Sequence, residues 1–174
     1  TLIDRIKFER RKIAGPGTAN RYLALVRSIL RRACHDWEWL DRVPKFSLFR
    51  EAEGRIRSIT VDELRRLLHE LPEHLADMVE FSVATGLRQA NVKGLEWRYV
   101  DLELRHAWIP GSKHKNGRPH AVPLNGIAVA VLKRQVGRHT THVFTYRGAP
   151  VTNVYTKAFK AALARAGIED FKWH

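Results

Sequence analysis

The stretch Ala84-Thr85-Gly86-Leu87-Arg88 decides how this chain folds, because it ends an apolar helical pattern on a sharp turn. The pattern before it carries Leu75, Met78, Val79, Phe81 and Val83 at helical spacing. Gly86 tolerates positive φ and therefore predicts the helix C-terminus. Arg88 is then expected at the rigid end of a helix, where a guanidinium can offer two parallel donors to a phosphate. The alternative is an ordinary ion pair between Arg88 and Glu96 or Asp101.

A hairpin with lysines near its tip is predicted about thirty residues further on. Residues 105–110 and 120–124 read as two strands, and Asn116-Gly117 between them favours a tight turn. Lys115 directly precedes the turn, where its ammonium could donate a proton to a departing oxygen. Lys113 is the second candidate for this role. A solvated basic turn is the other interpretation of the loop.

The composition predicts a polyanionic partner. The 174 residues contain 31 Lys and Arg against 18 Asp and Glu, giving a net charge of +13 and a pI near 10.5. This excess favours nucleic acid over a merely soluble basic protein. Cys34 is the one cysteine, which excludes an intramolecular disulfide and a cysteine zinc cluster. No apolar run approaches the roughly 20 residues of a membrane span, and no signal peptide is recognisable, so a reducing cytoplasm is the expected compartment.

One long helix is predicted in the first quarter of the chain. Thr18 is a suitable N-cap after Gly15-Pro16-Gly17, and Pro44 ends the segment. Apolar residues at helical spacing predict a single buried face, made of Tyr22, Leu25, Val26, Ile29, Leu30 and Ala33. The arginines between them either form a solvated face or contact DNA.

Residues 43–59 show little periodicity and predict a linker. The segment carries Arg50, Arg55 and Arg57, and a basic strap of this kind suits a phosphate backbone. A solvated charged loop is an equally good interpretation.

A second domain is predicted from Thr60, where Thr60 and Glu63 have the spacing of a capping box. Asn125 is a suitable cap for a later helix, and residues 143–145 predict a third strand. The last helix is expected from about Asn153 to Gly167. The predicted fold class is therefore mainly α with one small antiparallel β-sheet (α+β).

These features resemble the tyrosine recombinase (phage integrase) family, and the resemblance covers essentially the whole chain. Asn20-Arg21-Tyr22-Leu23 is similar to the family's N-terminal core-binding domain, and Ile59-Thr60-Val61-Asp62-Glu63-Leu64 to the start of its catalytic domain. Ala84-Thr85-Gly86-Leu87-Arg88, with Gly94-Leu95-Glu96-Trp97 after it, is similar to the box that holds the first catalytic arginine. Lys115-Asn116-Gly117-Arg118 with Val122-Pro123-Leu124 is similar to the hairpin that carries the catalytic lysine. Trp173-His174 resembles the entry to the His-x-x-Arg box.

The resemblance implies a domain plan and a set of site residues. Residues 1–50 are expected to be the C-terminal part of a helical core-binding (SAM-like) domain, with a linker to about residue 58. Residues 59–174 are expected to form a catalytic domain that is incomplete at its C-terminus. The implied catalytic residues are Arg88, Lys115 and His174, and the expected DNA-binding residues are Lys113, Arg118, Arg55 and Arg57. The resemblance implies neither a metal ion nor another cofactor.

Two departures from the family pattern bear on activity. Asn91 stands where the family usually has a glutamate. The second arginine, the next His/Trp position and the nucleophilic tyrosine are expected beyond residue 174, because none of Tyr22, Tyr99, Tyr146 or Tyr155 takes the matching place. The segment 1–174 is therefore expected to bind DNA without cleaving it, and its parent protein to cleave and rejoin DNA through a 3′-phosphotyrosine.

The expected partner is double-stranded DNA at recombination sites, with a homo-oligomer assembled on it and no membrane contact. Two other functions are compatible with the sequence. One is a non-catalytic DNA-binding integrase relic or regulator, and the other is an enzyme similar to type IB topoisomerases. A parent reading frame that continues to a later tyrosine favours the recombinase, whereas a natural stop after His174 favours the relic.

Overall fold

A computed structural model describes residues 2–52, 57–111 and 117–173 of the chain. The chain divides into two compact units, Thr1–Ile56 and Arg57–His174. Each unit is described by itself below. Arg55, Lys113, Lys115 and His174 lie outside the described residues.

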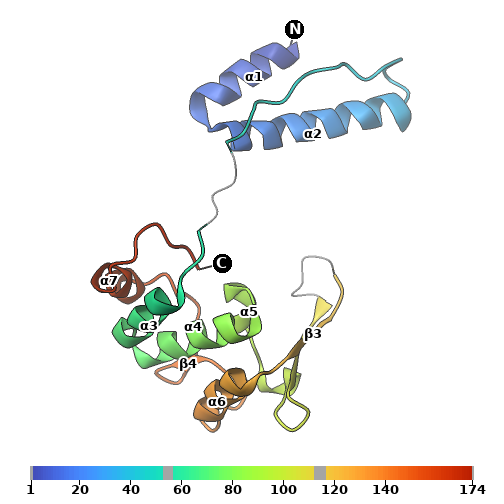
Figure 1. The fold of residues 1–174 in the computed structure, drawn as a ribbon. Helices are drawn as coiled ribbons and strands as arrows, with labels where there is room; N and C mark the ends of the chain where they lie inside the picture. Colours follow the sequence, from blue (N-terminus) through green and yellow to red (C-terminus); the bar gives the residue numbers. More distant parts are fainter. Residues whose placement is uncertain (1, 53–56, 112–116, 174) are drawn as a thin grey trace. The chain divides into compact units, whose positions relative to one another are not determined.

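Two helices make up most of the first unit. Helix α1 (Leu2–Ile13) packs against helix α2 (Pro16–His35) (Figure 1). Helix α2 begins at Pro16 and not at Thr18, so the predicted N-cap is wrong. Gly15 takes the cap position with an extended backbone, and Pro16 follows in the first turn. Proline suits this turn because its fixed φ is helical and its missing N–H needs no partner there.

The buried face predicted for α2 is wrong in most positions. Of the predicted residues only Ala33 is buried, and the interior of the unit is instead built on Leu23 and its neighbours. Tyr22, Leu25 and Ile29 are 43%, 58% and 47% exposed, and they line an open groove between α1 and α2. A period of 3.6 residues identifies an apolar stripe, but it does not identify an element that covers the stripe.

The segment that follows α2 forms no helix or strand over residues 43–52, yet it is attached to α2. The Asn20 amide donates to the Phe49 carbonyl (2.9 Å) and accepts the Phe49 N–H (2.8 Å). Arg27 donates to the Phe46 carbonyl (2.9 Å) and its guanidinium lies over the Phe46 ring. These bonds satisfy backbone groups that a sheet would otherwise pair. The predicted linker thus begins as a strap along α2.

The second unit is mainly helical, which confirms the predicted fold class. Helix α4 packs against α3 and α6, and helix α7 packs against α3 (Figure 1). The helices are α3 (Val61–Glu70), α4 (Glu73–Thr85), α5 (Gln89–Lys93), the 3-10 helix η1 (Trp97–Tyr99), α6 (Gly126–Gln135) and α7 (Lys157–Arg165).

The antiparallel β-structure expected beside these helices is present, and among the described residues it forms two small sheets instead of one. Strands β1 (Val100–Asp101), β2 (His106–Ile109) and β3 (His120–Pro123) pair in chain order, with Ala107 opposite Val122. Strands β4 (Thr145–Tyr146) and β5 (Ala149–Pro150) form a separate hairpin. Arg147 and Gly148 both have positive φ (52° and 78°), which closes this hairpin in two residues. The expected strand at residues 143–145 therefore pairs locally and does not join the larger sheet.

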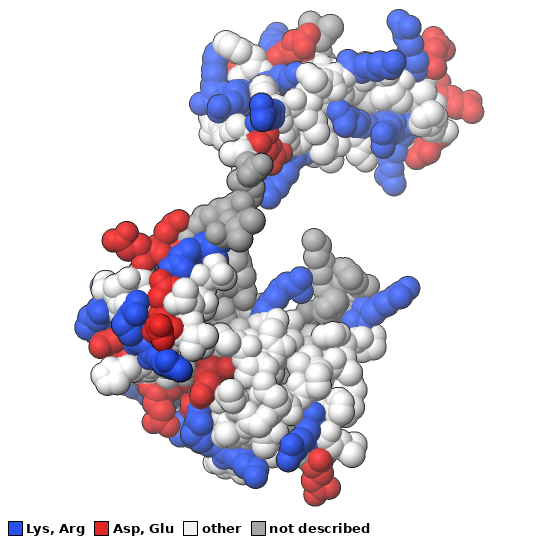
Figure 2. Space-filling model, in the orientation of Figure 1, with Lys and Arg blue, Asp and Glu red and all other residues white. Residues whose placement is uncertain are grey.

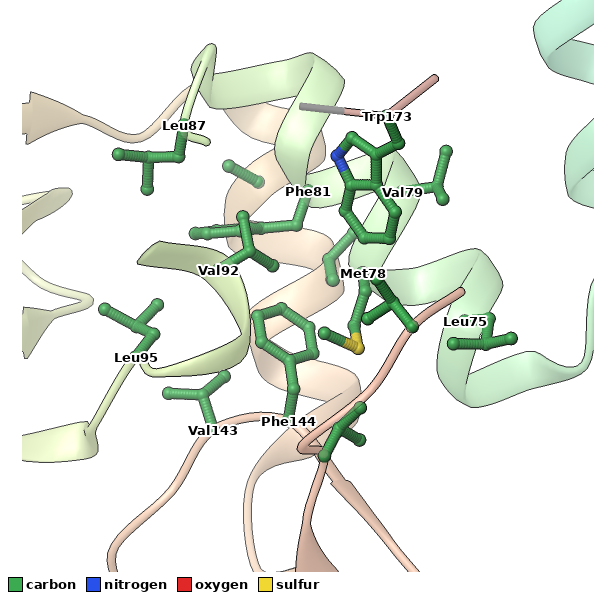
Figure 3. Close-up of a cluster of buried hydrophobic side chains, with 14 of the residues drawn as sticks. Leu75, Met78, Val79, Phe81, Leu87, Val92, Leu95, Val143, Phe144 and Trp173 are labelled. Atoms are coloured by element: carbon green, nitrogen blue, oxygen red, sulfur yellow. The ribbon is translucent and has the colours of Figure 1, made fainter. Parts of the chain in front are cut away.

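One hydrophobic core fills the second unit. Phe81 and Met78 on α4, Phe144 before β4 and Phe159 on α7 are each no more than 1% exposed. Figure 3 shows part of this cluster, with Trp173 among the labelled side chains. Trp173 is only 7% exposed, so the C-terminal segment of the unit packs into the same core as α4.

Side-chain caps fix where the helices begin, as the sequence predicts. The Thr60 hydroxyl accepts the Glu63 N–H (3.2 Å), and the Glu63 carboxylate accepts the Thr60 N–H (2.9 Å). The predicted capping box is confirmed, and so is Asn125 as the cap of α6. The last helix begins at Lys157 rather than near Asn153, because the Thr156 hydroxyl accepts the Phe159 N–H and sets the start.

Arg57 takes part in the same capping structure. Its guanidinium donates two bonds to Glu63, at 2.7 and 3.1 Å. This bidentate pair holds the residues that lead into α3. Contact between Arg57 and DNA stays a prediction, and it has to compete with this ion pair.

Glu63 makes the free energy of unfolding of the second unit depend on pH. The Arg57 hydrogen bonds, followed by the Thr60 N–H, lower the pKa of Glu63 from 4.5 to about 2. Because the folded-state pKa is depressed, the stabilisation is complete above pH 4.5 and is lost as pH falls toward 2. We expect Glu63→Gln to lower the melting temperature at pH 6, with the difference from wild type closing as pH approaches 2.

The control for this prediction is Asp62→Asn, measured by thermal unfolding over the same pH series. Asp62 lies in the same helical turn, but it contacts only the exposed Arg65. We expect a much smaller pH-dependent difference for this variant. Equal pH profiles for the two variants contradict the assignment of the effect to the Arg57–Thr60 cage.

Candidate functional site

The site is built on the turn that ends α4. Gly86 has φ of 69°, and its N–H donates to the Ser82 carbonyl (2.8 Å), which confirms it as the helix C-terminus. Leu87 then turns into the core and is 6% exposed, whereas Arg88 is exposed and begins α5. Within two residues the chain thus passes from a helix end to the core and back to the surface.

The Arg88 guanidinium has no hydrogen bond or ion pair with any residue that the structure describes. The carboxylates considered from the sequence are engaged elsewhere. Glu96 pairs with Arg98 at 2.8 Å, and Asp101 accepts two backbone N–H groups of its own turn at 3.0 and 2.8 Å. The simple ion-pair interpretation of Arg88 therefore finds no support among the described residues.

A hollow of about 620 Å³ opens beside Arg88. Its lining comes from α5, from the segment before α7 and from the C-terminal segment. The lining residues are Arg88, Gln89, Ala90, Tyr155, Lys172 and Trp173. Two of them are cations and none is a carboxylate, so the hollow suits an anion.

Trp173 is fixed to the Arg88 turn through one hydroxyl group. The Trp173 indole N–H donates to Ser82 Oγ (2.8 Å), and the Ser82 hydroxyl donates to the Leu87 carbonyl (2.8 Å). The indole also stacks on Phe159, with ring centroids 6.0 Å apart. The residue before Arg88 and the residue before His174 are thereby joined by two consecutive hydrogen bonds.

Tyr155 holds the backbone of Trp173 on the other side. Its hydroxyl accepts the Trp173 N–H and donates to the Trp173 carbonyl (3.3 Å). The Gln89 amide donates to the same carbonyl at 3.4 Å. Burial raises the pKa of the Tyr155 hydroxyl, with the hydrogen bond to Trp173 acting in the opposite direction.

Sequence reasoning did not identify Ser82 or Tyr155. These residues lie 91 and 18 positions from Trp173. No local pattern links residues at such separations, so only the fold reveals the contacts. A serine on the apolar side of α4 was the one available signal.

Four carboxylates on α3 and α4 pair with arginines on or near α6 and α7. Figure 2 shows Lys and Arg interleaved with Asp and Glu over the region of α3 and α7. The pairs are Glu70–Arg165 (2.6 Å), Glu73–Arg138 (2.5 Å), Asp77–Arg134 (2.7 Å) and Glu80–Arg134 (2.5 Å). These pairs neutralise negative charge on α3 and α4. The hollow has Arg88 and Lys172 in its lining and no carboxylate to offset their charge.

The structure describes the base of the predicted hairpin and not its tip. A Cβ placed on Gly111 would lie 2.3 Å from the Gly117 carbonyl oxygen, so the two backbones meet where the loop leaves the strands. Gly117 has φ of 65°, as the predicted turn requires. Arg118 is exposed beside it. Lys113 and Lys115 belong to the loop between these glycines, outside the described residues.

The described part of the chain contains neither a membrane-spanning helix nor a cluster of metal ligands. Its longest helices are too polar or too short to span a bilayer. Residues 2–52, 57–111 and 117–173 contain no three His, Cys, Asp or Glu side chains grouped closely enough to hold a metal ion.

Comparison with known proteins identifies the family of this chain. The model of the phage integrase family matches residues 57–174. The integrase of Salmonella phage P22 is 36% identical over 176 residues, which covers 94% of this chain and 46% of that protein. A shufflon-specific DNA recombinase of Escherichia coli is 32% identical over 167 residues, covering 90% of this chain and 41% of that protein. The chain thus spans less than half the length of these relatives.

A solved structure shares the fold. The crystal structure of XerA recombinase matches with a TM-score of 0.54 at 18% identity, over 97% of this chain and 61% of that chain. At this identity the likeness concerns the fold alone.

The left-handed turn at Gly86 generates a stability prediction. A Cβ at position 86 meets nothing within 4 Å, so Gly86→Ala should cost only backbone strain, about 1 kcal/mol. Gly86→Asn should cost less, because asparagine tolerates this conformation better than alanine. Urea unfolding measures the free energy of unfolding of both variants.

The matched control is Gly126→Ala in the first turn of α6, where a Cβ also meets nothing within 4 Å and φ is not positive. Equal effects at positions 86 and 126 contradict the argument.

Proposed function

The chain belongs to the phage integrase family, and from this premise we propose that it is part of a site-specific tyrosine recombinase that cleaves and rejoins DNA. Residues 57–174 supply part of the catalytic site in this proposal. The hollow beside Arg88 is the place where the scissile phosphate binds.

The observation that carries the proposal is the state of Arg88. Its side chain is presented by the turn between α4 and α5, without a carboxylate partner among the described residues, in a hollow that is also lined by Lys172. Arginine donors in a fork match two phosphate oxygens. Two cations in one hollow without a lining carboxylate create a positive potential that attracts an anion. The chemistry of the hollow therefore supports a phosphodiester ligand.

The proposed reaction places negative charge where Arg88 can stabilise it. A tyrosine oxygen attacks phosphorus, a 3′-phosphotyrosyl bond forms, and the bond from phosphorus to the 5′ oxygen breaks. Charge accumulates on the non-bridging oxygens during the attack. A positioned donor at such an oxygen typically lowers the barrier by about 3 kcal/mol. The 5′ hydroxyl of a second strand reverses the step, so no external energy source is required.

Two further residues complete the roles that this segment supplies. We assign Lys115 to protonation of the leaving 5′ oxygen and His174 to stabilisation of the phosphate charge. Gly111 and Gly117, the described residues on either side of the segment that contains Lys115, approach each other closely. The second arginine and the nucleophilic tyrosine are assigned to the part of the protein outside residues 1–174.

The proposed partner is duplex DNA containing the recombination site. Lys113, Arg118, Arg55 and Arg57 are proposed to contact its phosphate backbone, where charge gives affinity without sequence preference. The protein is proposed to act in the cytoplasm as a homo-oligomer assembled on paired sites. Neither a metal ion nor another cofactor takes part in the proposed steps.

Arg88→Ala in the full-length protein tests the proposal. Cleavage of a nicked suicide duplex that carries the element's own crossover site should fall by about a hundredfold or more, because a transition-state donor is lost. DNA affinity, measured by gel shift, should change little. Arg65→Ala is the control, since Arg65 is an exposed arginine of α3 whose one ion pair among the described residues is with Asp62.

Full cleavage by Arg88→Ala removes Arg88 from the site and with it the proposed phosphate pocket. A wild-type protein that binds DNA but cleaves none favours the non-catalytic alternative. Relaxation of supercoiled DNA by a monomer, without recombination of paired sites, favours the topoisomerase-like alternative.

The net charge of +13 generates a prediction for the 174-residue chain itself. Its affinity for a random-sequence DNA duplex should fall steeply as salt rises, because bound cations are released from the phosphates. Fluorescence anisotropy at several salt concentrations measures the slope. Affinity that stays constant from low to high salt contradicts a role for the basic residues in DNA binding.

A further inference from the structure

We propose that Ser82 and Tyr155 are positioning residues of the recombination site, which hold Trp173 against the turn that presents Arg88. The inference rests on the proposed function, because it concerns how the turn before Arg88 and the residue before His174 are held together. Neither side chain needs to touch DNA for this role.

Ser82 joins the two halves of the site with every polar group satisfied. It is 7% exposed on α4, one turn before Gly86. Its oxygen accepts the Trp173 indole N–H, and its hydroxyl hydrogen is used on the Leu87 carbonyl. The indole has one donor and Ser82 has one hydroxyl hydrogen, so both donors are used in these two bonds. A buried bond of this kind resists sliding, since any displacement leaves a donor without a partner.

Tyr155 fixes the main chain of Trp173 in a way that packing alone does not. Its hydroxyl contacts both the N–H and the carbonyl of this one residue. Its ring packs edge-on against Phe159, with centroids 5.3 Å apart, and Phe159 stacks on the indole. The side chain of Trp173 is thus held by Ser82 and its backbone by Tyr155.

The location of these bonds gives them their role. Leu87 directly precedes Arg88, and Trp173 directly precedes His174 in the chain. The links therefore act one peptide away from each proposed phosphate ligand. Donors that stabilise a transition state work through placement, and a shift of about 1 Å can cost about a hundredfold in rate. Hydrogen bonds that contribute only to folding need not join these two positions.

The test compares Ser82→Ala and Tyr155→Phe in the full-length protein. Each variant removes one hydroxyl and keeps the surrounding apolar contacts. Cleavage of the nicked suicide duplex is followed under single-turnover conditions with saturating protein. We expect the rate constant to fall by about tenfold to a hundredfold, while the fraction of substrate cleaved and the DNA affinity stay near wild type.

A merely structural role gives a different pattern. Destabilised protein lowers the fraction of active molecules, so the amplitude falls and the rate constant does not. Amide exchange measured on the 174-residue chain provides the second readout. Tyr155→Phe should speed exchange of the Trp173 amide and leave the α4 amides unchanged. Tyr146→Phe is the matched control, because Tyr146 is an exposed tyrosine of β4 whose ring stacks on His74.

Rate constants equal to wild type in both variants, or a loss confined to the amplitude, overturn the positioning role. The proposed function survives that result, because wild-type and Arg88→Ala activities decide it separately. A wild-type protein without cleavage overturns the proposed function, and the inference falls with it.

Discussion

The left-handed conformation of Gly86 is the constraint on which the site depends. It stops α4, so Leu87 can enter the core while Arg88 stays at the surface. The Leu87 carbonyl lies beyond the end of α4 on a buried residue and needs a donor, which the Ser82 hydroxyl supplies. This bond orients the serine oxygen toward Trp173. One backbone conformation therefore sets both the aim of the arginine and the anchor for the C-terminal segment.

The distribution of charge follows a related logic. The second unit places arginines opposite its carboxylates on α3, α4, α6 and α7, as in the pair between Asp77 and Arg134. Asp77 is 4% exposed, and a buried carboxylate is tolerated only with such partners. The cations of the Arg88 hollow have no comparable neighbours in its lining. The positive charge of the hollow is therefore not offset within its lining, whereas several carboxylates of the unit form ion pairs between helices.

The sequence predicts the parts of this structure that depend on local chemistry. The capping box at Thr60, the cap at Asn125 and the stop at Gly86 each require only neighbouring residues. The apolar stripe around Leu25 was misassigned because periodicity reports hydrophobicity and not what covers it. Arg88 was identified, but the links from Ser82 were not, since they join residues far apart in the chain.

Tyr155 illustrates why position matters more than residue type. A tyrosine beside an arginine in a phosphate-sized hollow is a natural candidate for a nucleophile. Its hydroxyl, however, is engaged by both backbone groups of Trp173, and burial raises its pKa. Attack on phosphorus requires an oxygen that is free to approach and to lose its proton. Both features make Tyr155 a poor nucleophile and a good support, so its hydroxyl serves the backbone of the protein rather than the DNA.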